Sequence, residues 1–333
     1  MAQALLKAVN ITKSFAGVQA LKGVSLEIMP GEVHCLAGEN GCGKSTLFRL
    51  LMQQESADSG EILLDGVNIW ADKKTTRQAR FRVGLVFQYP EYQLFEETSY
   101  KDIAFGPKNM GLKPDEIDRR VREAAGFVGL TEEQLKVSPF DLSGGQKRRV
   151  AIAGVIAMEP EVLILDEPTS QLDPIAASDF LNTVRKINIE LGTTVIITEH
   201  RLEDIFPYAD RAIVMDGGRV IADDTPRNIG KLLYEQKNDM FAAMPTPVRI
   251  FYGAKGEGDC PLTVREGRTW LSKEFPRLSE INCDSNPPME EKIPDPALSL
   301  KDLWFRYEKD GPDVLRGVTA DIPKGSLYAI VGG

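Results

Sequence analysis

The sequence has 333 residues, long for one domain, and its 42% hydrophobic content is typical of a globular protein. Its 40 Lys and Arg against 49 Asp and Glu give a net charge of −9, which argues against a general nucleic-acid-binding surface, so we expect no nucleic-acid partner. The four cysteines lack metal-ligand spacing, the longest apolar run is too short to cross a bilayer, and the first ten residues are too polar for a signal sequence.

The first predicted elements are two short strands with alternating polarity, at residues 5–11 and 24–28, and an apolar strand at residues 33–37. A helix is expected from Ser45 to Met52, because apolar residues recur there at helical spacing. The dipeptide Asp65-Gly66 then predicts a tight turn between two short strands.

A phosphate-binding loop is predicted between the third strand and the first helix, where residues 38–46 fit the pattern GxxxxGK[ST]. Glycines let the backbone N–H groups face a di- or triphosphate, Lys44 can reach the terminal phosphates, and the Ser45 hydroxyl can bind Mg²⁺. The positive end of the helix points at the same anion. A Gly-rich turn before a helix is the alternative interpretation. The expected nucleotide contacts in this loop are Gly38, Asn40, Gly41, Gly43, Lys44, Ser45 and Thr46.

The middle of the chain combines an aromatic loop with helices. A strand at residues 83–87 leads into an aromatic segment at residues 89–95 that a proline interrupts, and we expect this segment to contact a partner rather than to fill the core. Helices are predicted at residues 113–127 and 147–158, and Lys147-Arg148-Arg149 are expected on a solvated helix face.

Two later strands end in polar residues. Residues 162–165 are followed by Asp166-Glu167, the kind of carboxylate pair that P-loop enzymes use to hold Mg²⁺ and to position water. Residues 194–198 are followed by Glu199-His200, at the strand end where doubly wound sheets place their chemistry. His200 could instead simply cap its strand.

In this order, the motifs resemble those of the nucleotide-binding domain of ABC transporter ATPases, over roughly residues 5–229. The resemblance implies an α/β fold of the P-loop NTPase type, with a mostly parallel sheet core, a small antiparallel β subdomain and a helical subdomain. It also implies an ATPase that uses ATP and Mg²⁺ and works as a dimer of such domains.

The resemblance also implies roles for single residues. Phe15 is similar to the aromatic residue that stacks on adenine, although it could be ordinary core. The implied catalytic residues are Lys44, Gln88, Glu167 and His200, and the implied Mg²⁺ ligands are Ser45, Gln88 and Asp166. The LSGGQ signature at residues 142–146 implies that Ser143, Gly144 and Gly145 contact nucleotide held by an opposing domain.

Different parts of the sequence resemble different subgroups of this family. Residues 87–95 and 104–107 resemble the energy-coupling factor ATPases, which power vitamin and metal-ion uptake, whereas residues 14–21 and 38–41 resemble sugar-importer ATPases. We expect the ATPase of an energy-coupling factor importer for vitamins or metal ions, which lies peripherally at the cytoplasmic face of the cell membrane and has integral membrane transporter subunits as partners. The alternatives are a sugar-importer ATPase, a soluble non-transport ABC ATPase and a regulatory nucleotide-binding subunit. Residues 51–58 lack the glycine and proline common after the phosphate-loop helix.

An internal repeat indicates the start of a second copy, because residues 316–325 align with residues 22–31 at an offset of 294. Tyr307 then takes the place of Phe15, and Gly332 that of Gly38. The expected parts are a complete ABC nucleotide-binding domain at 1–229, a partly ordered Pro-containing linker at 230–297, and a truncated start of a second such domain at 298–333. The second domain of the dimer would be a tandem copy or another molecule.

Overall fold

The computed structural model describes residues 3–87, 89–170, 172–199, 201–276, 296–307, 309, 311 and 313–330. The chain forms two compact units, Met1–Glu274 and Phe275–Gly333. In the described parts of both units, no helix combines the length and apolarity that crossing a membrane requires.

A six-stranded sheet forms the centre of the first unit, in the order β10-β9-β3-β8-β7-β6. Its strands are β3 (Val33–Gly38), β6 (Val83–Val86), β7 (Val162–Asp166), β8 (Thr194–Thr198), β9 (Arg211–Asp216) and β10 (Arg219–Asp224). The strands from β9 to β6 are parallel, and β10 runs antiparallel to β9. The parallel strands are short and almost wholly buried, which is why they read as continuous apolar runs in the sequence.

The second sheet of this unit is antiparallel, in the order β2-β1-β4-β5. Its strands are β1 (Leu6–Phe15), β2 (Val18–Ile28), β4 (Ser59–Leu64) and β5 (Val67–Asn68). The first two strands are longer than expected, because the chain reverses only at Ala16-Gly17 and Gly23 forms a bulge inside β2. The predicted turn at Asp65-Gly66 is present, with positive φ at both residues.

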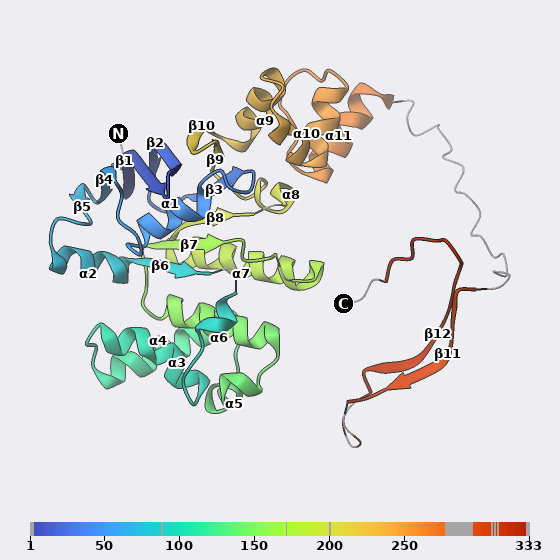
Figure 1. Cartoon of the computed structure of the whole chain (residues 1–333), viewed down its shortest axis with the longest axis horizontal. Helices are drawn as coiled ribbons and strands as arrows, with labels where there is room; N and C mark the ends of the chain where they lie inside the picture. Colours follow the sequence, from blue (N-terminus) through green and yellow to red (C-terminus); the bar gives the residue numbers. More distant parts are fainter. Residues whose placement is uncertain are drawn as a thin grey trace. The chain divides into compact units, whose positions relative to one another are not determined.

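The helical subdomain forms a separate layer below the sheet in Figure 1. Its elements are η1 (Pro90–Gln93), α3 (Ser99–Asn109), α4 (Pro114–Val128), α5 (Glu132–Lys136), η2 (Pro139–Asp141) and α6 (Gly144–Ile156). Helix α6 begins three residues before the predicted start at Lys147, because Ser143 and Gln146 form a capping box around its first turn. The other helices up to residue 205 are α1 (Lys44–Leu51), α2 (Lys73–Arg82), α7 (Pro174–Leu191) and α8 (Leu202–Ile205).

Residues 230–274 differ from the expected linker, because they fold as part of the first unit. The segment after β10 forms α9 (Pro226–Glu235), η3 (Asp239–Ala243), α10 (Thr246–Gly253) and α11 (Val264–Glu274). Met244, Val248, Phe251, Cys260 and Leu262 belong to the same buried cluster as residues of the central sheet and α6. Of the prolines that suggested a linker, Pro245 is the N-cap of α10 and Pro247 stands in its first turn, where the missing N–H costs nothing, while Pro287, Pro288 and Pro294 lie outside the described residues.

The described part of the second unit is an antiparallel hairpin of β11 (Leu298–Phe305) and β12 (Leu315–Ile322). Leu298 pairs with Ile322 as Leu6 pairs with Ile28 in β1 and β2, and the shift in register that follows Ala8 recurs after Leu300. The predicted repeat therefore extends to backbone pairing. Gly332, the predicted match of Gly38, lies outside the described residues.

Candidate nucleotide-binding site

Most of the predicted site residues lie at the carboxyl edge of the central sheet. The phosphate loop follows β3, Asp166 ends β7, and Thr198 ends β8. Asp166 and Thr198 are direct neighbours in the parallel register, so the ends of these strands meet at one edge. Gln88 and His200 follow β6 and β8 in the sequence but lie outside the described residues.

The phosphate loop has a backbone that only glycine fits at two positions. Gly38 and Gly43 have φ of 154° and 106°, and a Cβ atom at either would lie within 2.4 Å and 2.7 Å of a backbone oxygen, from Met215 and Ala20 respectively. The Lys44 ammonium is buried inside the loop and donates to the carbonyls of Gly38, at 2.6 Å, and of Glu39, at 3.0 Å.

The other predicted contacts of the loop are accessible. Asn40, Gly41 and Ser45 are exposed and Thr46 is half-buried, so the Ser45 hydroxyl stands open at the first turn of α1. A buried cation, exposed N–H groups and a helix start in one loop suit a polyphosphate anion. The residues present therefore fit the nucleotide that the sequence predicts.

A short hydrogen-bond chain connects the Asp166 carboxylate and the Glu167 backbone to the end of β8. The Thr198 hydroxyl donates to Asp166 Oδ1 at 2.9 Å and accepts the Glu167 backbone N–H at 2.9 Å. Glu167 has a φ of 46°, a left-handed backbone that costs energy for a non-glycine residue. Thr198 was not among the predicted residues, although a polar residue at the end of a buried strand was the available signal.

Phe15 lies at the tip of the β1–β2 hairpin and is exposed, which contradicts the alternative that it is ordinary core. The ammonium of Lys13 lies 5.1 Å from the centre of its ring. An exposed ring is available for stacking against a planar base.

The signature motif forms the first turn of α6. The Ser143 hydroxyl accepts the Gln146 N–H, and the Gln146 side chain accepts the Ser143 N–H, at 3.4 Å and 3.0 Å. Ser143, Gly144 and Gly145 are exposed, and a Cβ atom at either glycine would meet nothing within 4 Å. The motif therefore faces open space and can be approached by another molecule.

Arg148 corrects the expectation of a solvated basic face, because its side chain is only 3% exposed. Its Nη1 donates to the Pro168 carbonyl at 2.7 Å, and its Nη2 lies 3.8 Å from Glu91 Oε2. Glu199 is buried beside this group and accepts the Thr169 N–H at 3.0 Å. Helical spacing gave the missed signal, since Arg148 lies four residues before the buried Ile152 on the inward face of α6.

The aromatic segment after β6 is divided between surface and core. Tyr92 is 81% exposed and Phe95 is also exposed, with its ring edge-on to Phe105 at 4.9 Å. Leu94 is buried in the core cluster of the helical subdomain. The exposed aromatic side chains here are therefore Tyr89, Tyr92 and Phe95, together with Phe105 of α3, whereas Leu94 is not part of this surface.

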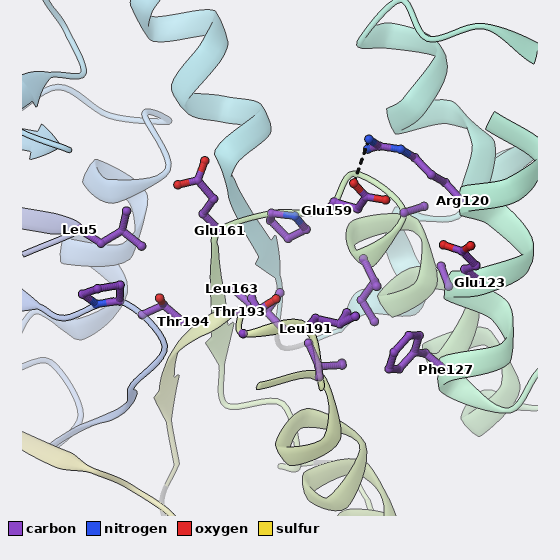
Figure 2. A pocket seen from close by; sticks show the side chains of 17 residues that line it. Leu5, Arg120, Glu123, Phe127, Glu159, Glu161, Leu163, Leu191, Thr193 and Thr194 are labelled. Carbon is purple, nitrogen blue, oxygen red and sulfur yellow. Dashed lines mark ion pairs between the residues drawn. The ribbon is translucent and has the colours of Figure 1, made fainter. Parts of the chain in front are cut away.

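A cavity of about 450 Å³ lies at another place in the first unit (Figure 2). It is lined by residues of α4, the loop after α6, the carboxyl-terminal end of α7 and the amino-terminal ends of β7 and β8, among them Phe127, Leu163 and Leu191. The Arg120–Glu159 ion pair, 2.9 Å long, lies at its rim. The cavity is at the amino edge of the sheet, whereas the phosphate loop and Asp166 are at the carboxyl edge, so it is no part of the nucleotide site.

Together, the parallel sheet, the phosphate loop after β3 and the carboxylates after β7 define a P-loop nucleotide-binding domain. Residues 21–170 match the ABC transporter family. The chain is 54% identical over 206 residues to the energy-coupling factor transporter ATP-binding protein EcfA2 of Clostridium perfringens, and the match covers 61% of this chain and 72% of that protein. It is 36% identical over 319 residues to a protein of Bacillus cereus described as an ABC transporter ATP-binding protein, with 94% of this chain and 56% of that protein covered.

Two solved structures are similar to the chain. The first is cbiO1 from Clostridium perfringens, described as part of the ABC transporter complex cbiONQ, with a TM-score of 0.64, 40% identity, and coverage of 71% of this chain and 95% of that chain. The second is the dimeric structure of an ATP-binding cassette in a post-hydrolysis state bound to ADP and Pi, with a TM-score of 0.60, 27% identity, and coverage of 66% and 98%.

The chain belongs to the ABC transporter ATP-binding proteins, in the group of the energy-coupling factor ATPases. It is therefore an ATP-binding and ATP-hydrolysing protein of the importer kind, with the predicted fold class confirmed.

Proposed function

We propose that this chain powers an energy-coupling factor importer for vitamins or metal ions by hydrolysing ATP at the carboxyl edge of its central sheet. The observation that carries the proposal is the Asp166–Thr198–Glu167 hydrogen-bond chain, which fixes the Asp166 carboxylate and the Glu167 backbone at the sheet edge where the phosphate loop also lies. The 54% identity to EcfA2 supports this substrate class over that of the sugar importers.

The residues divide the work of hydrolysis between binding and proton transfer. Lys44 and the backbone N–H groups of its loop hold the β- and γ-phosphates, while the exposed Phe15 ring stacks on adenine. Glu167 orients the attacking water and accepts its proton, because its carboxylate is a base that follows the Mg²⁺-binding Asp166 directly in the chain. His200, which follows β8, contacts the γ-phosphate. The contacts to the γ-phosphate are strongest as charge develops on the transferred group.

A divalent cation would be held by Ser45, Gln88 and Asp166. The Ser45 hydroxyl is exposed at the start of α1, and the Thr198 hydroxyl bonds one Asp166 oxygen, Oδ1, and so orients the carboxylate. Bound Mg²⁺ supplies positive charge against the phosphoryl oxygens. Carboxylate and hydroxyl oxygens are the ligands that Mg²⁺ prefers, so the donor set suits it.

Hydrolysis needs a second cassette in this proposal, because the signature motif faces away from its own unit. The exposed Ser143, Gly144 and Gly145 would cover nucleotide bound by the partner. The β11–β12 hairpin repeats the pairing of β1 and β2, which supports a tandem second domain as that partner. The Bacillus cereus protein supports the same view, since this chain matches only 56% of its length.

We further propose that integral membrane subunits dock on the surface of Tyr92, Phe95 and Phe105, and that the protein is thereby held at the cytoplasmic face of the membrane. Three exposed aromatic side chains gathered on two neighbouring elements are typical of an interface anchor. The surface follows directly after Gln88, so docking and nucleotide state can influence one another.

Glu167→Gln tests the proposal. The amide keeps the shape and the backbone N–H that bonds Thr198 but removes the base, so we expect turnover to fall by about 10²–10⁴-fold while ATP affinity stays within about threefold. Glu190→Gln, on the exposed end of α7, is the matched control and should hydrolyse ATP like wild type. Wild-type turnover in Glu167→Gln would refute the assigned role.

A further inference from the structure

We propose that Arg148 is a positioning residue that connects the backbone beside Glu167 to the segment Pro90–Gln93, so that docking on this segment adjusts the catalytic glutamate. The inference rests on the proposed function, since it concerns regulation of the same site.

Arg148 holds the turn that follows Glu167. Its guanidinium is buried under α6 and donates to the Pro168 carbonyl at 2.7 Å. Pro168 is the residue directly after Glu167, whose φ of 46° is unfavourable for a non-glycine residue. A hydrogen bond from a charged donor is about twice as strong as a neutral one, so this contact helps to maintain the turn.

The second arm of Arg148 forms a long ion pair with the carboxylate of Glu91. Its Nη2 lies 3.8 Å from Glu91 Oε2, which is too far for a hydrogen bond. That oxygen is buried and has no hydrogen-bond partner among the described residues. A buried carboxylate oxygen without a donor is costly, so shortening this ion pair by about 1 Å, to the usual length of about 2.8 Å, would stabilise it.

The position of Glu91 makes this gap sensitive to a partner. Glu91 lies in η1, and its next neighbour is Tyr92, the most exposed side chain of the proposed docking surface. A subunit that binds Tyr92 would shift η1, and the shift would bring Glu91 closer to Arg148 or take it further away. Because the other arm of Arg148 holds Pro168, the change reaches Glu167 through one side chain.

Glu199, from a third segment, also lies near the Arg148 guanidinium. Burial lowers the pKa of Arg148, while the charges of Glu91 and then Glu199 raise it, so both carboxylates lie within range of the guanidinium. Glu199 also accepts the Thr169 N–H at 3.0 Å, one residue beyond Pro168. Arg148, which lies on the signature helix α6, is therefore close to three other segments. They are represented by Glu91 after Gln88, Pro168 after Glu167, and Glu199 before His200.

The experiment compares Arg148→Lys, Glu91→Gln and their double variant in the full chain, with Arg149→Lys as the matched control. Arg149 is the exposed neighbour on the same helix. Steady-state ATP hydrolysis and hydrogen–deuterium exchange of the Glu167, Thr169 and Ser170 amides are measured, because lysine keeps the charge but cannot serve both arms. We expect Arg148→Lys to lower kcat at least about tenfold with KM within about threefold, and to speed exchange of the Thr169 amide. Glu91→Gln should lower kcat by about threefold, and the double variant should lose no more than Arg148→Lys alone.

Three results would overturn the inference. One is wild-type kcat and exchange in Arg148→Lys. Another is a parallel loss of ATP affinity, melting temperature and kcat, which would indicate a merely structural role. The third is multiplication of the two single losses in the double variant, which would remove the connection to Glu91. If the wild-type chain hydrolyses no ATP, the proposed function fails, and the exchange measurement alone decides the role of Arg148.

Discussion

The hairpins β1–β2 and β11–β12 have the same local structure in different surroundings. Asn10 and Asp302 both have positive φ, and their backbone N–H groups donate to the hydroxyls of Ser25 and Thr319, at 2.8 Å and 3.0 Å. These positions correspond in the alignment of the two copies. Short-range interactions therefore suffice to set the strand pairing, the bulge and the left-handed residue.

Burial separates the two hairpins. Leu6 is 0% exposed, because β4 and the phosphate-loop helix complete a core around it, whereas the equivalent Leu298 is 50% exposed. The residues that correspond to β3 also differ, since residues 33–38 form a parallel strand between β8 and β9 while residues 327–330 form no strand. A parallel strand needs neighbours far away in the sequence, so local sequence alone does not produce it.

The largest expected effect follows from the extent of the first unit. Truncation after Pro276 removes the second hairpin and should leave the melting temperature and ATP affinity unchanged, because the core of unit 1 stays complete. Truncation after Ile229 removes five buried apolar side chains worth about 1.5–3 kcal/mol each, which exceeds the usual stability of a domain. We expect this shorter chain to lack a cooperative thermal transition. A stable, ATP-binding product ending at residue 229 would show that α9–α11 are dispensable.

A matched pair of substitutions tests the difference between the hairpins directly. Leu6→Ala should lower the free energy of unfolding by about 2–5 kcal/mol, because it leaves a cavity in a closed core. Leu298→Ala should change it by less than about 0.5 kcal/mol, since the side chain is already half in water. Urea denaturation of both variants measures the two values. Equal losses would mean that the second hairpin is buried in solution.

The sequence predicted the site better than the extent of the domain. The phosphate loop and the strand end at Asp166 follow from short patterns whose chemistry is local, and the structure has them where expected. Met244 and Phe251 share a buried cluster with residues of the central sheet and α6, which are far away in the sequence, so their segment resembled a linker. Arg148 was misassigned for the same reason, because its partners Pro168 and Glu91 come from other elements.

His34 should make the stability of the first copy depend on pH, and the second copy has no equivalent histidine. His34 is fully buried in β3, and burial, followed by the charge of Arg211, lowers its pKa to about 4, whereas its counterpart by the 294-residue offset is Tyr328. The unfolded state takes up a proton near pH 6.5 and the folded state only near pH 4. Stability is therefore complete above pH 6.5 and is lost as the pH falls through this window, by about 3 kcal/mol in all.

His34→Gln removes this titration and keeps an acceptor for the Met29 N–H. Urea denaturation at pH 7 and pH 5 should show a smaller loss in the variant than in wild type. Burial, and then the charge of Asp210, raises the pKa of the neighbouring Glu32. This shift changes stability with pH in the opposite direction to His34, but it is the same in wild type and in His34→Gln. Parallel pH profiles would show that His34 does not titrate in this range.

The smallest expected effect concerns Gln53, whose backbone is left-handed and which has no counterpart in the second hairpin. Asn10 and Asp302 are residue types that tolerate positive φ, but Gln53, just after α1, has a φ of 57°. It lies in the stretch that lacks the glycine common to the family. Its side-chain amide is buried, and neither of its polar atoms has a hydrogen-bond partner among the described residues.

Gln53→Gly should therefore stabilise the protein, in contrast to most glycine substitutions. The substitution relieves about 1–2 kcal/mol of backbone strain and removes an unsatisfied amide that costs about 1–3 kcal/mol. Two effects oppose this gain: the packing of the side chain is lost, and glycine has greater freedom in the unfolded chain. The Arg80 guanidinium donates to the Gln53 carbonyl, which the substitution keeps. We expect a net gain of about 1–2 kcal/mol in urea denaturation. Gln54→Gly, at the exposed next position where φ is not positive, is the control and should cost about 0.5–1 kcal/mol. If both variants lose stability alike, the packing of the Gln53 side chain outweighs the strain of its backbone.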